Sequence, residues 1–167
     1  PNALGLVTMF SISHLPLLAG KIGFCPIPGL FSFYERDLEA ITRWRPELVI
    51  TLTHWSEIEQ RGIEGFPEKL KAMDIDWIYF PIEDYGVPKK NEPEWANIST
   101  KSNTILRTGG RVLCHCNAGC GRSGMIVLRI MCESGETADQ ALQRLRKVKD
   151  CAVETNEQLI WATEELK

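Results

Sequence analysis

The sequence has no hydrophobic run near the roughly 18 residues that a membrane span needs, and no basic-then-apolar secretory leader with a cleavage site. It also lacks an excess of positive charge, because 19 basic and 22 acidic residues give a formal net charge of -3. A broad basic surface for nucleic acid or anionic membrane is therefore not expected. We predict a soluble, cytoplasmic, monomeric protein whose attraction for anions is confined to a local site.

The sequence also lacks the paired Cys-x2-Cys motifs of structural zinc modules, although it contains six cysteines. Three of them crowd into seven positions, and three are scattered through segments with regular patterns: Cys114, Cys116 and Cys120, then Cys25, Cys132 and Cys151. This distribution favours reduced thiols over a disulfide framework. We predict no metal and no cofactor.

A length of 167 residues with 44% hydrophobic content predicts one domain, residues 1–167. Short apolar segments rich in β-branched or aromatic residues predict core strands at residues 21–25, 47–52, 76–82 and 111–116, with an edge strand at 6–12. Helical patterns occupy residues 34–44, 67–73, 92–108, 123–133, 137–148 and 155–166. The alternation predicts an α/β fold, with a central, mostly parallel sheet of about five strands flanked by helices.

Local signals mark the ends of several of these elements. Thr137 and Thr155 each begin a Thr-x-x-Gln pattern, which is typical of a capping box, and Gly109 is placed to end the helix at 92–108. Three stretches have no regular pattern and are long enough to border a site: residues 26–32, 54–66 and 84–91.

The segment "HCNAGCGRSG" at residues 115–124 joins a predicted buried strand to a predicted helix. Gly119 and Gly121 allow consecutive backbone amides to point at one place, which suits a tetrahedral oxyanion. Arg122 can bind two phosphate oxygens at once, and the helix N-terminus adds partial positive charge that favours the thiolate of Cys116. A thiolate beneath a bound phosphate is a candidate nucleophile.

Two other interpretations of this segment are a metal site formed by Cys114, Cys116 and Cys120, and a buried thiol in a tight turn. The first lacks a second pair of ligands, and the second leaves Arg122 and the two glycines unexplained. Ser123 follows the arginine. Its hydroxyl could donate a hydrogen bond to the sulfur when a thiophosphate breaks down, or it could simply cap the helix.

A phosphate ester also needs an acid that protonates its leaving oxygen, from another loop at the same end of the sheet. "FPIEDYGVP" at residues 80–88 follows a predicted strand and contains Glu83 and Asp84. Adjacent side chains diverge, so only one of these carboxylates is expected to face the site.

"HCNAGCGRSG" matches His-Cys-x5-Arg-Ser and so resembles the signature of the cysteine-dependent protein tyrosine phosphatase superfamily, in particular its dual-specificity branch. Three further blocks occur in the order seen in the cyclin-dependent kinase-associated phosphatase group: "GFCPIPG", "PIEDYGVP" and "AVETNEQ". The resemblance therefore spans most of the chain. It implies hydrolysis of phosphotyrosine, and also of phosphoserine or phosphothreonine, in a phosphorylated protein or peptide.

The resemblance also implies a role for each matching residue. Cys116 would be the nucleophile, Arg122 the phosphate clamp, Asp84 rather than Glu83 the general acid and then base, and Ser123 the partner of the sulfur. Two matching positions would support the site, His115 by orienting the loop and Gln158 in the last motif. The phosphate would rest on the backbone amides of Asn117, Ala118, Gly119, Cys120, Gly121 and Arg122.

The sequence departs from the family pattern at two positions. Glu154 stands where some members carry a water-positioning glutamine, and Cys120 stands where members that favour inositol phospholipids often carry lysine. A non-protein phosphate ester and a non-catalytic phosphate-binding scaffold remain alternatives. If Cys116 is oxidised, Cys120 and Cys25 are both candidates to pair with it.

Overall fold

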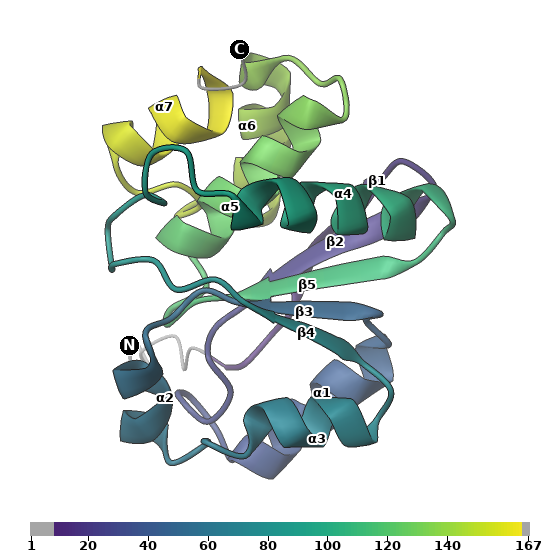
Figure 1. Ribbon diagram of the computed structural model, residues 1–167, viewed down its shortest axis with the longest axis vertical. Helices are drawn as coiled ribbons and strands as arrows, with labels where there is room; N and C mark the ends of the chain where they lie inside the picture. Colours follow the sequence, from purple (N-terminus) through teal and green to yellow (C-terminus); the bar gives the residue numbers. More distant parts are fainter. Residues whose placement is uncertain (1–8, 165–167) are drawn as a thin grey trace, which may run out of the picture.

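The centre of the protein is a five-stranded sheet in the order β1-β2-β5-β3-β4 (Figure 1). The computed structural model describes residues 9–164. Its strands are β1 Ser13–Leu17, β2 Gly20–Cys25, β3 Leu48–Thr51, β4 Asp76–Tyr79 and β5 Arg111–His115. Strand β1 runs antiparallel to β2, and the other neighbouring strands are parallel. The predicted α/β fold with a mostly parallel sheet is confirmed.

Helices cover both faces of the sheet (Figure 1). One face carries α1 Tyr34–Trp44, α2 Trp55–Arg61 and α3 Phe66–Ala72, and the other carries α4 Glu94–Arg107, α5 Gly121–Glu133, α6 Ala138–Val148 and α7 Asn156–Thr163. Successive residues of β3 point to opposite faces, so Val49 packs in the cluster that includes α1 to α3 and Ile50 packs in the cluster on the other side. Strands buried on both faces read as continuous apolar runs, which is the pattern seen in the sequence.

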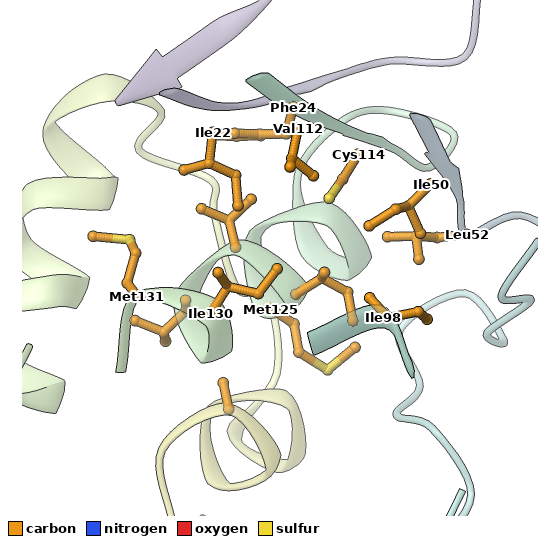
Figure 2. Close-up of a cluster of buried hydrophobic side chains, with 14 of the residues drawn as sticks. Ile22, Phe24, Ile50, Leu52, Ile98, Val112, Cys114, Met125, Ile130 and Met131 are labelled. Atoms are coloured by element: carbon orange, nitrogen blue, oxygen red, sulfur yellow. The ribbon is translucent and has the colours of Figure 1, made fainter. Parts of the chain in front are cut away.

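Helix α5 lies at the centre of the larger core cluster, and ten of its residues are buried. Figure 2 shows Ile22, Val112 and Cys114 on the strands directed toward Met125 and Ile130 of α5. Full burial of one such aliphatic side chain stabilises the fold by about 1.5–3 kcal/mol. The first turn of α5, which follows the candidate loop, is therefore held firmly in place.

The edge strand is not where the sequence predicted it. Residues 6–8 of the predicted strand at 6–12 lie outside the described residues, and residues 9–12 form no strand. The edge strand is β1, whose sequence "SHLPL" has a weak strand pattern because it contains His14 and Pro16. Proline is tolerated there because an edge strand is paired on one side only.

The stretch at residues 54–66 was predicted to be irregular, and this was wrong. It contains α2, a helix of seven residues in which only Ile58 is buried. One buried residue in two turns leaves no helical periodicity for sequence analysis to detect.

The predicted helix ends are largely confirmed. The hydroxyl of Thr137 accepts a hydrogen bond from the Gln140 amide, and Thr155 forms a full capping box with Gln158. Gly109 follows α4 with φ of 86°, a left-handed conformation that glycine adopts easily. Among residues 9–164, no helix is both long and apolar enough to span a bilayer.

The parallel strands carry three connecting segments to the same edge of the sheet. The Leu52 amide donates to the His115 carbonyl at 3.0 Å, and the Ile82 amide donates to the Leu52 carbonyl at 3.0 Å. These bonds hold the segments after β3, β4 and β5 beside one another. Ligand sites in parallel α/β sheets commonly lie at this carboxyl edge.

Candidate active site

The loop after β5 places Cys116 at the carboxyl edge of the sheet, in agreement with the predicted strand–loop–helix order. Strand β5 ends at His115, α5 begins at Gly121, and Cys116 is only 2% exposed. Gly119 has φ of 77°, and a Cβ atom there would lie 2.7 Å from the carbonyl carbon of Cys25. This loop packs directly against the chain after β2, so glycine is required at 119.

The backbone amides of this loop are unpaired, as the cradle expected from the sequence requires. Within residues 9–164, the amides of Asn117, Ala118, Gly119 and Cys120 donate to no other backbone group, and no side chain accepts from them. Gly121 is the first residue of α5, so its amide has no partner inside the helix. Consecutive unpaired amides beside a helix N-terminus favour an anion.

Arg122 is held against this loop by Glu57 on α2. The two carboxylate oxygens of Glu57 accept from Nη1 at 2.9 Å and from Nη2 at 2.8 Å, and the Ile82 carbonyl accepts from Nη1 at 3.1 Å. The Nε of Arg122 is buried and has no partner among the described residues. The guanidinium is therefore fixed on one side while its Nε–H remains available to an anion.

The pKa of Glu57 is lowered and the pKa of Arg122 is raised, so both partners of this ion pair are held in their charged forms. Burial by itself raises the pKa of Glu57, but hydrogen bonds from Arg122 and from the His54 amide bring it below its usual value. Burial by itself lowers the pKa of Arg122, but Glu57 and the nearby Cys116 raise it above its usual value. Glu57 is a site residue that sequence reasoning missed. The only feature of the sequence that could have indicated Glu57 is that it is an acidic residue soon after the end of a buried strand.

His115 is a neutral, buried link between the loop and the sheet. Burial lowers the pKa of His115 to about 4. Its Nδ1 donates to the Cys116 carbonyl at 3.1 Å, and its Nε2 accepts from Thr51 Oγ1 at 2.8 Å. The Nε1 of Trp77 donates to the same hydroxyl at 2.8 Å. This chain of hydrogen bonds fits the predicted role of His115 in orienting the loop.

The lowered pKa of His115 predicts an acid-sensitive fold. Between about pH 6.5 and 4 the unfolded chain binds a proton at His115 and the native protein does not, so stability falls as pH falls through this window. We expect the free energy of unfolding to drop by about 2 kcal/mol between pH 7 and 5 from this residue. Urea denaturation at both pH values should show a smaller drop for His115→Asn than for the wild type. Equal drops in the two proteins would contradict this account.

Ser123 lies inside α5 and does not cap it, because Cys120 occupies the N-cap position. Its hydroxyl is buried and has no hydrogen-bond partner within the described part of the chain. The interpretation of Ser123 as a simple cap is therefore wrong. Because the Ser123 hydroxyl is buried and unpaired, it is free to donate a hydrogen bond to the Cys116 sulfur. This role of Ser123 is a proposal.

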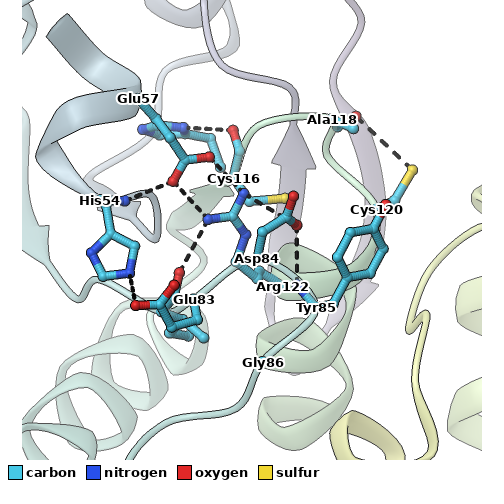
Figure 3. Close-up of polar contacts among 12 residues, drawn as sticks. His54, Glu57, Glu83, Asp84, Tyr85, Gly86, Cys116, Ala118, Cys120 and Arg122 are labelled. Atoms are coloured by element: carbon cyan, nitrogen blue, oxygen red, sulfur yellow. Dashed lines mark hydrogen bonds and ion pairs between the residues drawn. The ribbon is translucent and has the colours of Figure 1, made fainter. Parts of the chain in front are cut away.

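Asp84 and Glu83 diverge, as the sequence predicted. Asp84 lies 3.5 Å from Arg122 Nη2, whereas Glu83 turns away to His54 Nε2 at 3.1 Å (Figure 3). The side chain of Asp84 is 57% exposed, so it is free to reorient toward a bound ligand. Of the two carboxylates, Asp84 is the one that faces the loop.

The last motif connects α7 to both sides of the site. Gln158 is buried, accepts from the Glu154 amide at 2.9 Å, and donates from Nε2 to the Gly86 carbonyl at 3.1 Å. The segment containing Asp84 is thus braced from α7, which fits the supporting role expected for Gln158. The Glu154 carboxylate lies so close to Gly121 that a Cβ atom there would collide with it.

Cys120 is bonded to Cys151 in a disulfide, which corrects the prediction of reduced thiols. Because its sulfur is already bonded, Cys120 is not available as the candidate partner of Cys116, and the trio of Cys114, Cys116 and Cys120 cannot act together as metal ligands. Sequence analysis missed the pairing because the two cysteines are 31 residues apart and meet only after α5 and α6 have packed. Cys25 is a free, buried cysteine, so it is the other candidate partner of Cys116. Burial and the neighbouring Cys116 raise the pKa of the Cys25 thiol, which disfavours its reactive thiolate form.

Comparison with known proteins agrees with this geometry. The family model described as protein-tyrosine phosphatase matches residues 46–166. A curated relative, the Bos taurus protein tyrosine phosphatase domain-containing protein 1, is 29% identical over 112 residues. That match covers 64% of this chain and 13% of the bovine protein.

Solved structures share the fold over nearly the whole chain. A kinase-associated phosphatase with serine in place of its catalytic cysteine has a TM-score of 0.83 at 20% identity, covering 95% of this chain and 94% of its own. Tk-PTP in its active form has a TM-score of 0.73 at 25% identity, and the match covers 93% of this chain and 98% of Tk-PTP. PTPMT1 in complex with PI(5)P has a TM-score of 0.73 at 15% identity, and the match covers 91% of this chain and 93% of PTPMT1. The family model, the shared fold and the Cys-x5-Arg loop agree, and this chain belongs to the protein-tyrosine phosphatase family.

Proposed function

We propose that this protein hydrolyses phosphate monoesters on phosphorylated proteins or peptides, taking phosphotyrosine and also phosphoserine or phosphothreonine. The observation that carries the proposal is the set of unpaired hydrogen-bond donors around Cys116. The loop amides that follow Cys116 in the chain have no backbone partner, and the buried Nε–H of Arg122 is unpaired among the described residues. Arg122 lies close enough to the buried Cys116 for that cysteine to raise the pKa of the guanidinium. Such donors stabilise the charge of a transferring phosphoryl group.

The first chemical step transfers the phosphoryl group to the protein. The Cys116 sulfur attacks phosphorus, the bond to the leaving oxygen breaks, and Asp84 gives that oxygen a proton. Arg122 and the loop amides bind the equatorial oxygens. Asp84 would turn from Arg122 toward the leaving oxygen as phosphate takes its place on the guanidinium.

The second step returns the site to its starting state. Asp84, now a carboxylate, takes a proton from a water molecule that attacks phosphorus, and the bond between sulfur and phosphorus breaks. Ser123 would stabilise the departing thiolate by donating its unpaired O–H. Neither step needs a metal or a cofactor.

Phosphate release from a small aryl phosphate tests the proposal directly. Freshly purified protein treated with a chelator should hydrolyse the aryl phosphate and a phosphotyrosine peptide. Absence of release from both substrates would refute the proposal. If the wild type and Cys116→Ser bind a phosphopeptide equally well and neither releases phosphate from it, a non-catalytic scaffold would be favoured instead.

A non-protein ester is the second candidate, because a structure that shares this fold contains PTPMT1 bound to PI(5)P. Cys120 weighs against it, since its sulfur is held by Cys151 and supplies no positive charge for a lipid headgroup. Comparing phosphate release from phosphopeptides, inositol phospholipids and RNA 5′-phosphate ends in one assay separates these substrates. A phosphopeptide should be turned over fastest.

The assignment of Asp84 as the acid predicts an unequal effect of two adjacent substitutions. Asp84→Asn should lower turnover of a phosphopeptide by about 10²-fold, because the leaving oxygen then departs without its proton. Glu83→Gln is the matched control and should keep most activity, since Glu83 faces His54. Turnover numbers of both variants check the prediction. A larger loss in Glu83→Gln would exchange the two roles.

A further inference from the structure

A second groove adjoins the phosphate-binding loop. It has a volume of about 470 Å³ and extends from Ala118 and Cys120 of that loop to residues 146–151 at the end of α6. We refer to it as the α6 groove. The disulfide between Cys120 and Cys151 ties its two walls together. Ala118 and Cys120 belong both to the phosphate-binding loop and to the lining of the α6 groove, so a ligand whose phosphate lies over Cys116 could extend along the loop toward this groove.

The α6 groove is positively charged on a protein whose net charge is -3. Arg146, Lys147 and Lys149 line it, opposed by Asp150 alone. The guanidinium of Arg146 donates to the Ala152 and Val153 carbonyls, which have no charge to neutralise it. Within the described residues, Lys147 and Lys149 form no ion pair.

Apolar side chains complete the lining of the α6 groove. Met9, Phe31 and Val148 border it and are 71%, 39% and 40% exposed. Exposed apolar surface next to unpaired ammonium groups suits an extended peptide that has both carboxylates and aliphatic stems.

The opposite side of the site has the opposite charge. Another groove, of about 480 Å³, is bordered by His54 and by three carboxylates against one lysine: Glu83, Glu92 and Glu94, with Lys89. Figure 3 shows His54 and Glu83 on one side of Arg122 and Cys120 on the other. A flat anionic membrane over the site would meet these carboxylates, whereas a peptide can direct its acidic end into the α6 groove alone. The charge pattern thus favours a peptide over a lipid surface.

We infer that the α6 groove binds acidic residues lying on one side of the phosphorylated residue in a peptide substrate, with Lys147 and Lys149 as the residues that select them. The inference rests on the proposed function for its substrate class. It adds a direction to that function, because acidic residues on the other side would meet Glu83 and Glu92.

Peptide binding by the Cys116→Ser protein tests the inference whether or not the wild type turns over. Four phosphotyrosine peptides are compared: neutral flanks, acidic residues before the phosphotyrosine, acidic residues after it, and basic residues in place of the acidic ones. One acidic peptide should bind about tenfold tighter than the neutral one. Adding Lys147→Ala and Lys149→Ala should remove this advantage, and so should high salt, which screens exposed charges.

Lys69→Ala with Lys71→Ala is the matched control, because both lysines are exposed on α3, on the other side of the sheet. This pair should leave the peptide preference unchanged. Equal binding of all four peptides, or an acidic preference that persists without Lys147 and Lys149, would overturn the inference. So would binding to phosphatidylserine vesicles that depends on these lysines while peptide binding does not. Failure of the wild type to hydrolyse an aryl phosphate would count against the proposed function alone.

Discussion

Replacing Cys116 with serine should lower phosphate release on the order of 10⁴-fold or more, while a phosphopeptide still binds. A serine hydroxyl is far less nucleophilic at neutral pH than a thiolate, so the covalent step stops. The loop amides and Arg122 are untouched, and serine is slightly smaller than cysteine. Binding should therefore be preserved or improved.

Two measurements check this expectation together. Phosphate release is followed with an aryl phosphate, and peptide affinity is followed by fluorescence anisotropy. Cys132→Ser is the matched control, since Cys132 is a free cysteine on α5, half-buried and close to the far end of that helix. It should keep wild-type turnover. Turnover by Cys116→Ser equal to that of Cys132→Ser would remove Cys116 from the mechanism.

Loss of the disulfide between Cys120 and Cys151 should lower the free energy of unfolding by about 3–4 kcal/mol. The bond closes a loop across a separation of 31 residues, and opening it restores conformational entropy to the unfolded chain. The phosphate-binding loop would also lose its covalent tie to the turn before α7. Its amides would then be less well ordered for phosphate.

Urea denaturation of Cys120→Ser, Cys151→Ser and the double variant measures the effect. All three should show the same loss, because either substitution breaks the same bond, and a dithiol reductant should bring the wild type down to the same stability. Cys132→Ser again serves as the control and should respond to the reductant as the wild type does. A wild type whose stability is unchanged by complete reduction would contradict the prediction.

Local sequence patterns determined most of the regular structure. The helix predicted at residues 34–44 is α1 with the same ends, and the four core strands were placed within a few residues. These elements were readable because each combines an apolar pattern with a glycine, proline, threonine or charged residue at its boundary. The two failures, β1 and α2, have little or no such pattern.

The linear order of residues 115–124 also determined the candidate chemistry. A cysteine at a strand end, two glycines and an arginine at a helix start are close together in the chain, so their meeting in space required no tertiary information. The segment with Asp84 could be placed at the same edge because parallel strands bring their carboxyl ends together.

Tertiary structure alone decided which distant residues complete the site. Glu57 reaches Arg122 across 65 positions of sequence, and Gln158 reaches Gly86 across 72. Cys120 and Cys151 meet only after α5 and α6 pack side by side, and the same packing forms the α6 groove. No local pattern encodes these contacts, because each depends on where whole elements pack in the folded core. The sequence by itself thus determined the loop and its nucleophile, and packing determined the partners that hold the arginine, the acid segment and the loop in place.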